Sequence, residues 1–456
     1  MNAQWQNPRR ITERILIQGE LVLETPTHLG NGDADGPLDM PLNRDELKGH
    51  ALLTGTSIAG ALRNYAGQVI SPAAAARLFG RVTEDESEQS WLIVEDARGS
   101  LPVVELRDGV KIDPATRTAD DKKKFDIELL SAGMTFPLAF ELPVPANGGA
   151  ELIQTLAVAL KGLEEGKISL GKRKARGYGR CRVDGWRLTR WDMRTPAGLV
   201  EWLEGKPGKD PTDKIELLLD LKLDDFDEPL ACELEGTFKI HSSLLIRSGA
   251  GQQGQVDVVH LKTRRNGSEV PVLSGTSLAG ALRGRAMRIA NTLNKDGKAV
   301  ANALFGYLPD KDHSGEPLQA SRVWVEESII ERPQEMVQSR LKIDRLTGGA
   351  YPGALFQEQP VFGAGSAQVK VKLRIRKASS ADVGLILLLL KDLWTGDLPL
   401  GGESGVGRGR LRGIDATLRY QGACWKLSEQ GEILEIVQSQ GPQKKLQDFV
   451  DAFVKG

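Results

Sequence analysis

Cysteine is scarce in this 456-residue sequence. Its three cysteines, Cys181, Cys232 and Cys424, are far apart, and no Cys-x-x-Cys pair occurs. An odd and dispersed set argues against a disulfide framework and against a zinc site. The five histidines show neither HxxxH nor HExxH spacing, which argues against a zinc hydrolase. We therefore expect a protein of the reducing cytoplasm.

Long apolar runs are missing as well. The longest, Leu385 to Leu390 with its neighbours, is too short to cross a bilayer, and the polar start MNAQWQNPRR lacks the apolar centre of a signal peptide. We expect no membrane partner. No Gly-Lys-Ser/Thr closes a glycine-rich stretch into a Walker loop, which argues against a nucleotide-dependent enzyme.

An excess of charge of one sign is also absent. The 60 Lys and Arg residues are balanced by 61 Asp and Glu residues, giving a formal net charge of -1. A nucleic-acid binder of this composition must therefore gather its positive charge locally. Aromatic residues make up only 5% of the chain, whereas glycine occurs 51 times, so many turns and close backbone approaches are expected.

What the sequence does contain is an internal duplication. The stretch LTGTSIAGALR at 53–63 returns as LSGTSLAGALR at 273–283, an offset of 220 residues. Three shorter matches follow in the same order: Leu78-Phe-Gly80 with Leu304-Phe-Gly306, Ile112-Asp-Pro-Ala-Thr116 with Ile343-Asp-Arg-Leu-Thr347, and Gly177-Tyr-Gly-Arg180 with Gly405-Val-Gly-Arg408. Two copies with so long a period indicate a duplicated domain rather than a solenoid.

We predict one domain over 12–190 and a second over 214–420. A linker over 191–213 contains Lys-Pro-Gly-Lys-Asp-Pro, and a tail over 421–456 has apolar residues at helical spacing in 443–454. Alternation predicts strands over 15–23, 136–141, 236–245 and 369–375, and helical spacing predicts helices over 57–66, 152–164 and 381–393. Each copy is therefore expected to have an α+β fold.

The duplicated Gly-Thr-Ser turn is the first candidate site. Thr56 or Ser57 can cap the following helix, whose free N–H groups attract phosphate, and Arg63 lies about two turns along. An ordinary cap with a solvated arginine is the alternative. Recurrence at identical spacing favours a phosphate-binding role for both sets, the second of which is Thr276, Ser277 and Arg283.

A glycine-rich basic stretch is the second candidate. It spans 171–182, and its six basic residues with no acid predict phosphate contacts by Lys172, Arg173, Lys174, Arg176 and Arg180. The second copy, over 401–410, carries Glu403 and is less basic; there we predict contacts by Arg408 and Arg410. A glycine-rich hairpin with a solvated charge run remains the alternative.

A single aspartate before each Gly-Thr-Ser turn is the third candidate. Asp39 and Asp257 lie 218 residues apart, in line with the repeat, and each follows a glycine-rich stretch. An aspartate in such a loop can bind Mg²⁺ or position an attacking hydroxyl. Alternatively, it is a loop or cap residue.

Taken together, these motifs resemble the RAMP superfamily, and within it the Cas-seven-like backbone subunits of type III CRISPR effectors. The resemblance covers most of both halves. It is carried by the Gly-Thr-Ser-x-Ala-Gly-Ala-Leu-Arg, Leu-Phe-Gly and Ile-Asp-x-x-Thr motifs, the last followed by Phe125 or Phe356, and by the glycine-rich loops. The loop LDMPLNRD at 38–45 is similar to the one that bears the family's target-cutting aspartate.

The resemblance implies a modified RRM-like (ferredoxin-like) core in each half. It also implies a thumb-type hairpin around 113–132 and another around 344–356. Such subunits line up along a guide RNA, hold its backbone and kink the guide–target duplex at intervals. A fused pair looks like a type III-D-like system. The implied partners are CRISPR guide RNA, complementary target RNA and other type III effector subunits.

The same resemblance implies that Asp39 and Asp257 each support cleavage of the target RNA. Mg²⁺ or another divalent cation would be bound at each aspartate only when RNA is present. Asp257 departs from the family pattern, because its loop reads Asp-Val-Val-His rather than Asp-x-Pro. Two alternatives stay open: a non-catalytic scaffold that binds guide RNA, and a guide-processing ribonuclease with histidine chemistry. The latter is disfavoured because no histidine recurs between the copies.

Overall fold

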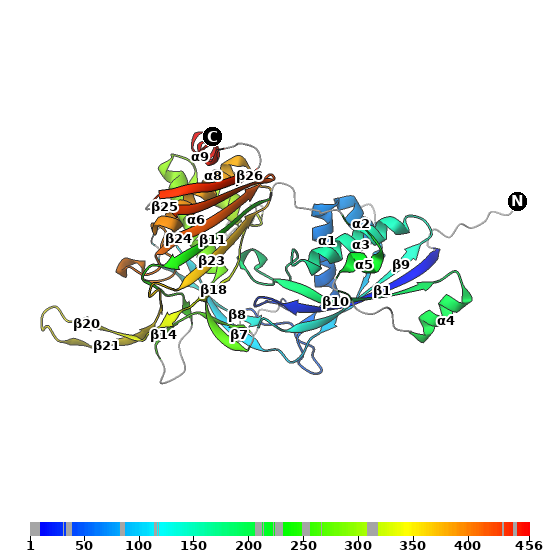
Figure 1. Cartoon of the computed structure of the whole chain (residues 1–456). Helices are drawn as coiled ribbons and strands as arrows, with labels where there is room; N and C mark the ends of the chain where they lie inside the picture. Colours follow the sequence, from blue (N-terminus) through cyan, green and yellow to red (C-terminus); the bar gives the residue numbers. More distant parts are fainter. Residues whose placement is uncertain are drawn as a thin grey trace. The chain divides into compact units, whose positions relative to one another are not determined.

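The computed structural model divides into two units, each with its own sheet and helices (Figure 1). Unit 1 comprises Met1–Glu105, Glu128–Lys174 and Gly179–Glu228, and unit 2 comprises Leu106–Ile127, Ala175–Tyr178 and Pro229–Gly456. Two short segments of the first repeat therefore belong to unit 2. The structure describes residues 10–30, 32, 39–82, 87–113, 116, 118–205, 212, 214–221, 223, 231–248, 256–265, 267–307, 318–430, 433–440 and 445–456.

The sheet of unit 1 has four antiparallel strands in the order β10-β1-β9-β5. The strands are β1 (Ile11–Leu23), β5 (Ile93–Val94), β9 (Thr135–Pro145) and β10 (Cys181–Asp192). Alternation along β1 buries Ile15, Ile17, Leu21 and Leu23. The strands predicted over 15–23 and 136–141 are confirmed.

Helices cover one face of this sheet. The helix α3 (Gly149–Glu164) packs against β9 and β10, and α1, α2 and α5 pack around α3. These three are α1 (Gly55–Val69), α2 (Pro72–Phe79) and α5 (Ile215–Leu219). Leu152, Leu156 and Leu160 lie at the spacing that places them on one buried face of α3. The helices predicted over 57–66 and 152–164 are confirmed.

Unit 2 repeats this arrangement in a larger sheet. Its order is β15-β16-β18-β23-β11-β24-β25-β26, with β17 also paired to β23. The central order β24-β11-β23 matches β10-β1-β9 of unit 1. The strands are β11 (Cys232–Ile240), β15 (Lys262–Arg265), β16 (Ser268–Leu273), β17 (Val323–Val325), β18 (Ser328–Glu331), β23 (Gln368–Ile375), β24 (Leu411–Tyr420), β25 (Ala423–Gln430) and β26 (Ile433–Gln440).

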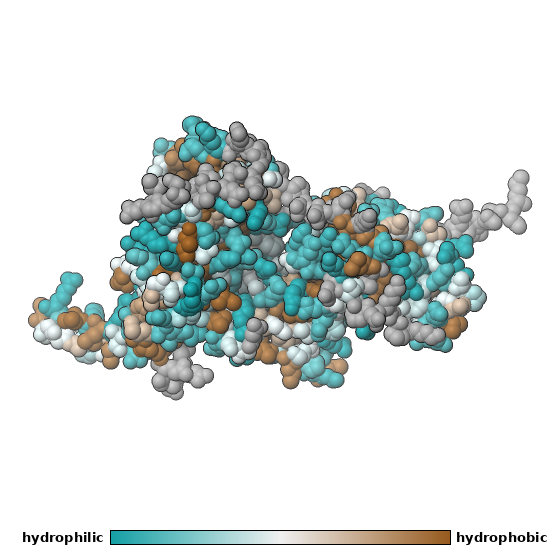
Figure 2. Space-filling model, in the orientation of Figure 1, coloured by the Kyte–Doolittle hydropathy of each residue, from teal (hydrophilic) through white to brown (hydrophobic). Residues whose placement is uncertain are grey.

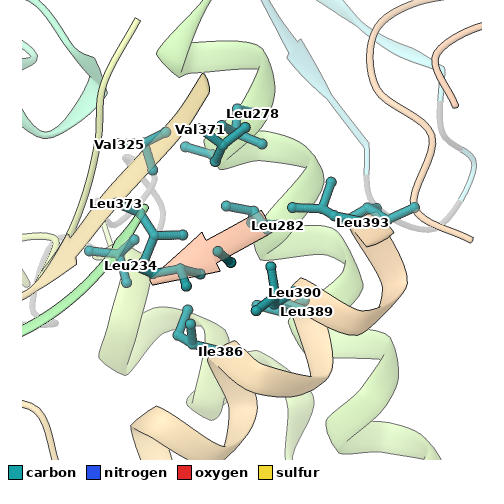
Figure 3. Packing of buried hydrophobic residues seen from close by; sticks show 14 of the residues in the cluster. Leu234, Leu278, Leu282, Val325, Val371, Leu373, Ile386, Leu389, Leu390 and Leu393 are labelled. Carbon is teal, nitrogen blue, oxygen red and sulfur yellow. The ribbon is translucent and has the colours of Figure 1, made fainter. Parts of the chain in front are cut away.

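The core of unit 2 lies between this sheet and the helices α6 (Gly275–Thr292) and α8 (Ser380–Thr395). Figure 3 shows Leu278 and Leu282 of α6 with Leu389 of α8 and Leu234 and Val371 of the sheet. The helix α7 (Gly297–Phe305) packs on α6. These elements form two α+β units, so the α+β class predicted from the sequence is confirmed.

The C-terminal segment extends unit 2. Its strands β25 and β26 are added to the edge of the sheet next to β24, and α9 (Leu446–Lys455) packs on α8. Phe449 of α9 lies edge-on to Tyr420 and Trp425, with ring centroids 5.7 and 5.6 Å apart. This segment therefore contributes to the core, and the helix expected within 443–454 is present.

The segment expected to be a linker contains regular structure. Strand β10 continues to Asp192, and α4 (Pro196–Glu204) follows, with Thr195 as its N-cap. Residues 206–211 and 213, which hold most of the Pro-Gly signal, lie outside the described residues. Within the described part of the chain, no helix is long and apolar enough to cross a membrane.

Each repeat contributes a long hairpin. The first pairs β7 (Val104–Ile112) with β8 (Ala119–Leu130), and the second pairs β20 (Gln338–Ile343) with β21 (Ala350–Gln359). The Oδ1 of Asp113 accepts a hydrogen bond from Thr116 N, and that of Asp344 accepts from Thr347 N. The Asp and Thr of the Ile-Asp-x-x-Thr motif are thus hydrogen-bonded to each other at the tip of each hairpin. The hairpins therefore begin earlier than the expected 113 and 344.

The second hairpin projects from unit 2 with apolar side chains on its surface (Figure 2). Leu346 at its turn is 97% exposed, and Ile343, Tyr351 and Leu355 are also exposed. Short strands frame its base in two small sheets, β13-β14-β21-β20 and β12-β22-β19. These strands are β12 (Ser243–Leu244), β13 (Arg247–Ser248), β14 (Val258–His260), β19 (Gln334–Glu335) and β22 (Val361–Phe362).

In the first repeat, β2 (Leu52–Leu53) pairs with β6 (Ala97–Arg98), and β3 (Arg81–Val82) pairs with β4 (Ser87–Glu88).

Candidate nucleic-acid interface

The Gly-Thr-Ser turn begins a helix in both repeats, but its cap is one residue before the glycine. Thr54 caps α1 and Ser274 caps α6, each accepting a hydrogen bond from a serine N–H at 3.3 Å. The prediction that Thr56 or Ser57 is the cap is therefore wrong. Thr54 has the extended backbone that a cap requires, whereas Thr56 and Ser57 lie within the first turn of α1.

The hydroxyl groups of this turn bond to one another in the same way in both repeats. Thr54 Oγ1 donates to Ser57 Oγ at 2.9 Å, and Ser274 Oγ donates to Ser277 Oγ at the same distance. In unit 1 the N–H of Gly55 already binds the carboxylate of Asp96 at 2.7 Å. The helix dipole at α1 is thus partly compensated by the protein itself.

A cavity of about 370 Å³ opens beside this turn in unit 1. Thr54 and Ser57 line it together with Asn43, which the sequence did not single out. The remaining lining residues are Leu29, Gly30, Leu52 and Leu53. Its polar side is therefore made of hydroxyl and amide groups, which can donate hydrogen bonds to phosphate or ribose oxygens.

The two equivalent arginines differ in their surroundings. Arg63 is exposed and makes no hydrogen bond or ion pair with other described residues. Arg283 is half-buried and donates to Gly306 O at 2.6 Å and to Asn302 Oδ1 at 2.5 Å. Arg283 therefore ties α6 to the end of α7, whereas Arg63 is exposed, and the RNA contacts of both arginines stay predictions.

The two glycine-rich loops share a backbone conformation with a register of 230 residues. The predicted pairing of Gly177 with Gly405, an offset of 228, is wrong by two residues. Because both loops contain several closely spaced glycines, alignments with offsets of 228 and 230 look alike in sequence. The positions with positive φ angles match only at an offset of 230. The matched pairs are Arg173 and Glu403 (φ 58° and 59°), Gly177 and Gly407 (86° and 88°), and Gly179 and Gly409 (79° and 82°). In this register Tyr178 corresponds to Arg408, and Arg180 corresponds to Arg410.

The basic residues of the first loop are divided between solvent and protein. Lys172 is exposed, and Arg173 and Lys174 are partly exposed. Within unit 2, Arg176 donates to Phe305 O at 3.1 Å. In unit 1, Arg180 lies 3.4 Å from a carboxylate oxygen of Glu24. The exposed charge is therefore concentrated at the start of the loop.

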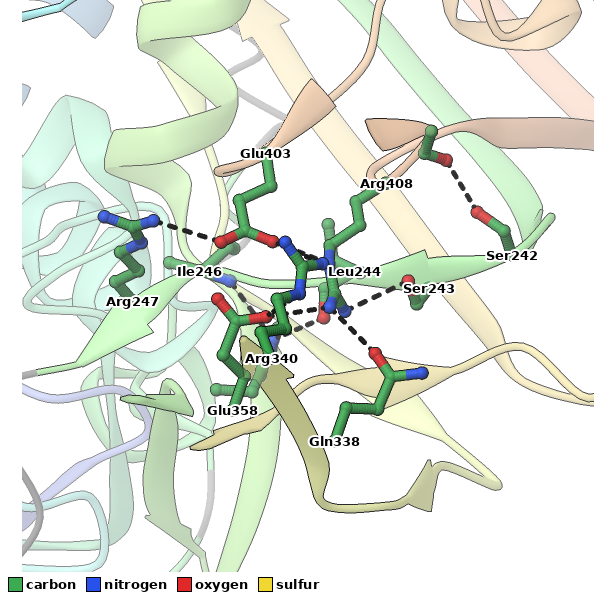
Figure 4. Close-up of polar contacts among 12 residues, drawn as sticks. Ser242, Ser243, Leu244, Ile246, Arg247, Gln338, Arg340, Glu358, Glu403 and Arg408 are labelled. Carbon is green, nitrogen blue, oxygen red and sulfur yellow. Dashed lines mark hydrogen bonds and ion pairs between the residues drawn. The ribbon is translucent and has the colours of Figure 1, made fainter. Parts of the chain in front are cut away.

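In the second loop, Arg408 lies inside unit 2 with its side chain 4% exposed. Figure 4 shows its guanidinium held by Glu358 and Glu403, each at 2.9 Å, with further bonds to Ser243 and Gln338. Its donors are therefore used within the fold, and the RNA contact predicted for Arg408 stays a prediction. Arg410 is exposed.

Arg340 completes this network by reaching the same two carboxylates, Glu358 at 2.9 Å and Glu403 at 3.0 Å. Burial and the nearby Glu403 raise the pKa of Glu358, which is fully buried. Burial opposes ionisation of Glu403 too, but its hydrogen bond with Glu358 and the charges of Arg340 and Arg408 lower the pKa of Glu403. Sequence analysis missed this cluster because its members come from three distant segments.

Both candidate aspartates are exposed, and each lies next to the return strand of its repeat's hairpin. In unit 1, Met40, which follows Asp39, accepts a hydrogen bond from Glu128 N of β8 at 3.2 Å. In unit 2, Val258, which follows Asp257, pairs with Glu358 of β21. The structure thus places the two aspartates in equivalent positions.

The two aspartate loops differ in detail. The carboxylate of Asp257 accepts a hydrogen bond from Gln357 N at 2.7 Å. The glycine-rich stretches expected before the aspartates lie largely outside the described residues, at 31, 33–38 and 249–255. Among the described residues, no group of three or more His, Cys, Asp or Glu side chains is arranged to hold a metal ion.

The duplicated units, the glycine-rich loops and the paired aspartates define a tandem protein of the RAMP type. The family model for the RAMP superfamily matches residues 20–182 and 237–412, which is most of both repeats, and the chain belongs to that superfamily. Among characterised proteins, it is similar to the CRISPR system Cmr endoribonuclease Cmr4 of Pyrococcus furiosus. The two are 33% identical over 108 residues, which cover 23% of this chain and 37% of Cmr4.

Proposed function

We propose that this chain is a backbone subunit of a type III, III-D-like CRISPR effector, which binds guide RNA and cleaves the paired target RNA at two metal-dependent sites. Each repeat would be a modified RRM-like domain with a thumb-type hairpin. One observation carries the proposal: both repeats place an exposed aspartate beside the return strand of a long hairpin, Asp39 near Glu128 and Asp257 near Gln357. Membership of the RAMP superfamily and similarity to a Cmr endoribonuclease support it.

The proposed reaction asks little of the protein. RNA supplies its own nucleophile, the 2′-hydroxyl, and holding it in line with the scissile phosphate can contribute several kcal/mol, within the roughly 7–11 kcal/mol ceiling for orientation. Asp39 and Asp257 would each hold one Mg²⁺ or another divalent cation together with RNA oxygens. The cation would stabilise negative charge on the phosphate. The aspartate's part is to keep its carboxylate at a fixed place beside the kinked duplex.

Guide binding would rely on the exposed donors of both repeats. Arg63, Lys172 and Arg410 are exposed, and Ser57 lines the cavity at the start of α1. The partly exposed set consists of Arg173, Lys174, Thr276 and Ser277. Such contacts read the phosphate backbone, while base pairing with the guide reads the target sequence. A near-neutral chain can bind RNA in this way because only the contact surface needs positive charge.

The second hairpin supports a role in kinking the duplex. Its apolar surface at Ile343, Leu346 and Leu355 is exposed in unit 2. Exposed apolar clusters of this kind usually contact a partner. Inserted between base pairs, they would unstack one step, as apolar wedges do in other nucleic-acid complexes.

A non-catalytic scaffold is the second candidate, and one observation favours it at the second site. The carboxylate of Asp257 already accepts a hydrogen bond from Gln357 N, so its role can be to fix the loop. In that case the chain would bind guide RNA while other subunits cut.

Cleavage by the reconstituted effector separates the two candidates. The complex is assembled with wild-type chain or with the double variant Asp39→Ala/Asp257→Ala, and is given labelled complementary RNA and Mg²⁺. We expect equal target binding by both complexes and discrete cuts by the wild type alone. Identical product ladders would establish the scaffold. Cleavage that persists in EDTA would instead indicate metal-free chemistry.

A further inference from the structure

We infer that Glu128 and Glu358 are positioning residues that hold the two candidate aspartate loops in place, Glu128 directly and Glu358 through the strand beside Asp257. Neither side chain was expected to matter from the sequence motifs. The inference rests on the proposed function for its catalytic consequence, but its structural part stands on hydrogen bonds within each unit.

Glu128 contacts the Asp39 loop at three points. Its N–H donates to Met40 O at 3.2 Å, its Oε2 accepts from Leu42 N at 3.0 Å, and its Oε1 accepts from Arg44 Nη2 at 3.1 Å. The side chain is only 13% exposed. One residue thus fixes the stretch that directly follows Asp39 from both its backbone and its carboxylate.

Neighbouring contacts hold Glu128 itself. Its carbonyl oxygen lies 2.9 Å from Nδ1 of His28, which is fully buried. Burial lowers the pKa of His28, so the ring is neutral near pH 7 and its Nδ1–H can donate to this carbonyl. The end of β8 is therefore anchored to the body of unit 1.

Glu358 occupies the equivalent place in unit 2 and works by a different set of contacts. It pairs with Val258 next to Asp257, and the residue before it donates to the Asp257 carboxylate. Its own carboxylate is buried between Arg340 of β20 and Arg408 of the glycine-rich loop, both at 2.9 Å. Glu358 therefore fixes the strand β21 through its two arginine partners, and β21 in turn binds the carboxylate of Asp257.

Such restraint matters because an isolated aspartate on a loop samples many positions. Catalytic groups need to be held within about 0.5 Å of their productive place, and a displacement of about 1 Å can cost on the order of 100-fold in rate. Removing the Glu128 carboxylate would release Leu42 N and Arg44 while leaving the Asp39 carboxylate present.

The test uses the complete effector and compares the two cuts. Glu128→Ala is expected to slow the cut assigned to Asp39 by roughly 10–100-fold and to raise the Mg²⁺ concentration that this cut needs, with the Asp257 cut unchanged. Glu128→Gln keeps an acceptor for Leu42 N and should recover part of the rate. Glu358→Gln should slow only the cut assigned to Asp257 and leave the Asp39 cut unchanged. The matched control is Glu141→Ala, because Glu141 pairs with Arg14 on the sheet of the same unit; it should leave both cuts unchanged.

Hydrogen exchange of the chain provides a readout that does not need cleavage. Glu128→Ala should speed exchange of the Leu42 amide by at least 10-fold, whereas Glu141→Ala should not. Unchanged exchange at Leu42, or an equal loss of both cuts in Glu128→Ala, would overturn the inference. If the wild-type complex does not cut, the proposed function fails, and the exchange result alone decides whether Glu128 restrains the loop.

Discussion

Arg107 and Glu327 form a two-point ion pair within unit 2, with side chains 4% and 0% exposed. The guanidinium of Arg107 also lies 5.5 Å from the ring centre of Tyr178, and Arg265 approaches the same carboxylate at 3.5 Å. Arg107 lies on β7, so the first repeat's hairpin is anchored on the same unit as Glu327. Buried pairs of this kind are costly to break from one side, because the remaining charge is left without a partner.

Substitution of Glu327 tests the importance of this pair. Glu327→Gln leaves Arg107 buried beside a neutral amide, and we expect the free energy of unfolding of unit 2 to fall by about 3–5 kcal/mol. Denaturant titration of the purified chain measures it. The exposed control Glu331→Gln should stay within about 0.5 kcal/mol of the wild type. Equal stability of the two variants would contradict the prediction.

Arg408 and Arg410 form a matched pair with opposite expected roles. Arg408→Met removes one of the two arginines that bind Glu403 and the buried Glu358, and should lower the free energy of unfolding by about 3 kcal/mol. Arg410→Met should leave stability nearly unchanged, yet weaken guide RNA binding and reduce the slope of log affinity against log salt by about 1. Unfolding curves and RNA titrations at several salt concentrations check both. A stable Arg408→Met chain with weakened RNA binding would reverse the assignment.

The helix caps give a direct test of the Gly-Thr-Ser turn. Thr54→Ala removes the oxygen that accepts from Ser57 N and should lower stability by about 1 kcal/mol. Thr56→Ala removes only a hydroxyl that bonds to Thr54 Oγ1 at 3.1 Å, and a smaller loss is expected. Thermal unfolding of the two variants ranks them. The opposite ranking would show that Thr56 is the cap after all.

His260 predicts a pH dependence for unit 2. The ring is buried, with Nε2 2.9 Å from Val272 O and Nδ1 3.2 Å from Ile246 N, and burial lowers the pKa of His260 below its ordinary value of 6.5. The unfolded chain therefore binds a proton more readily than the folded chain. The stability that comes from keeping His260 neutral is fully present above about pH 6.5. It is lost as the pH falls from there toward the folded-state pKa of His260.

Denaturant midpoints at pH 7.5 and 5.5 measure this effect. The wild type should lose more stability on acidification than His260→Gln, whose side chain does not titrate. Parallel losses in both proteins would rule out His260 as a cause.

Much of the fold could be predicted from short motifs because they fix local structure. The Gly-Thr-Ser-x-Ala-Gly-Ala-Leu-Arg stretch marks a helix in both repeats, and alternation in 15–23 and 369–375 marks central strands. Hairpin limits were harder to predict, because the Ile-Asp-x-x-Thr motif marks only the hairpin tip, where Asp113 and Asp344 accept hydrogen bonds.

The residues of the candidate site could be predicted only where they recur at the same place in both repeats. Asp39 and Asp257 were found from their equal spacing. The burial of Arg283 and Arg408 could not be predicted, because it depends on partners such as Asn302 and Glu358 that lie far away in sequence. The sequence did contain one signal for the positioning residues Glu128 and Glu358: Phe125-Asp-Ile-Glu128 and Phe356-Gln-Glu358 both place a glutamate just after the repeated phenylalanine.

The most direct measurement maps the target RNA fragments made by effectors carrying the single variants. If both aspartates support cleavage, Asp39→Ala removes one cut, Asp257→Ala removes a different cut, and target affinity is unchanged in each. A product ladder that is the same for the wild type and both variants would contradict a two-site ribonuclease.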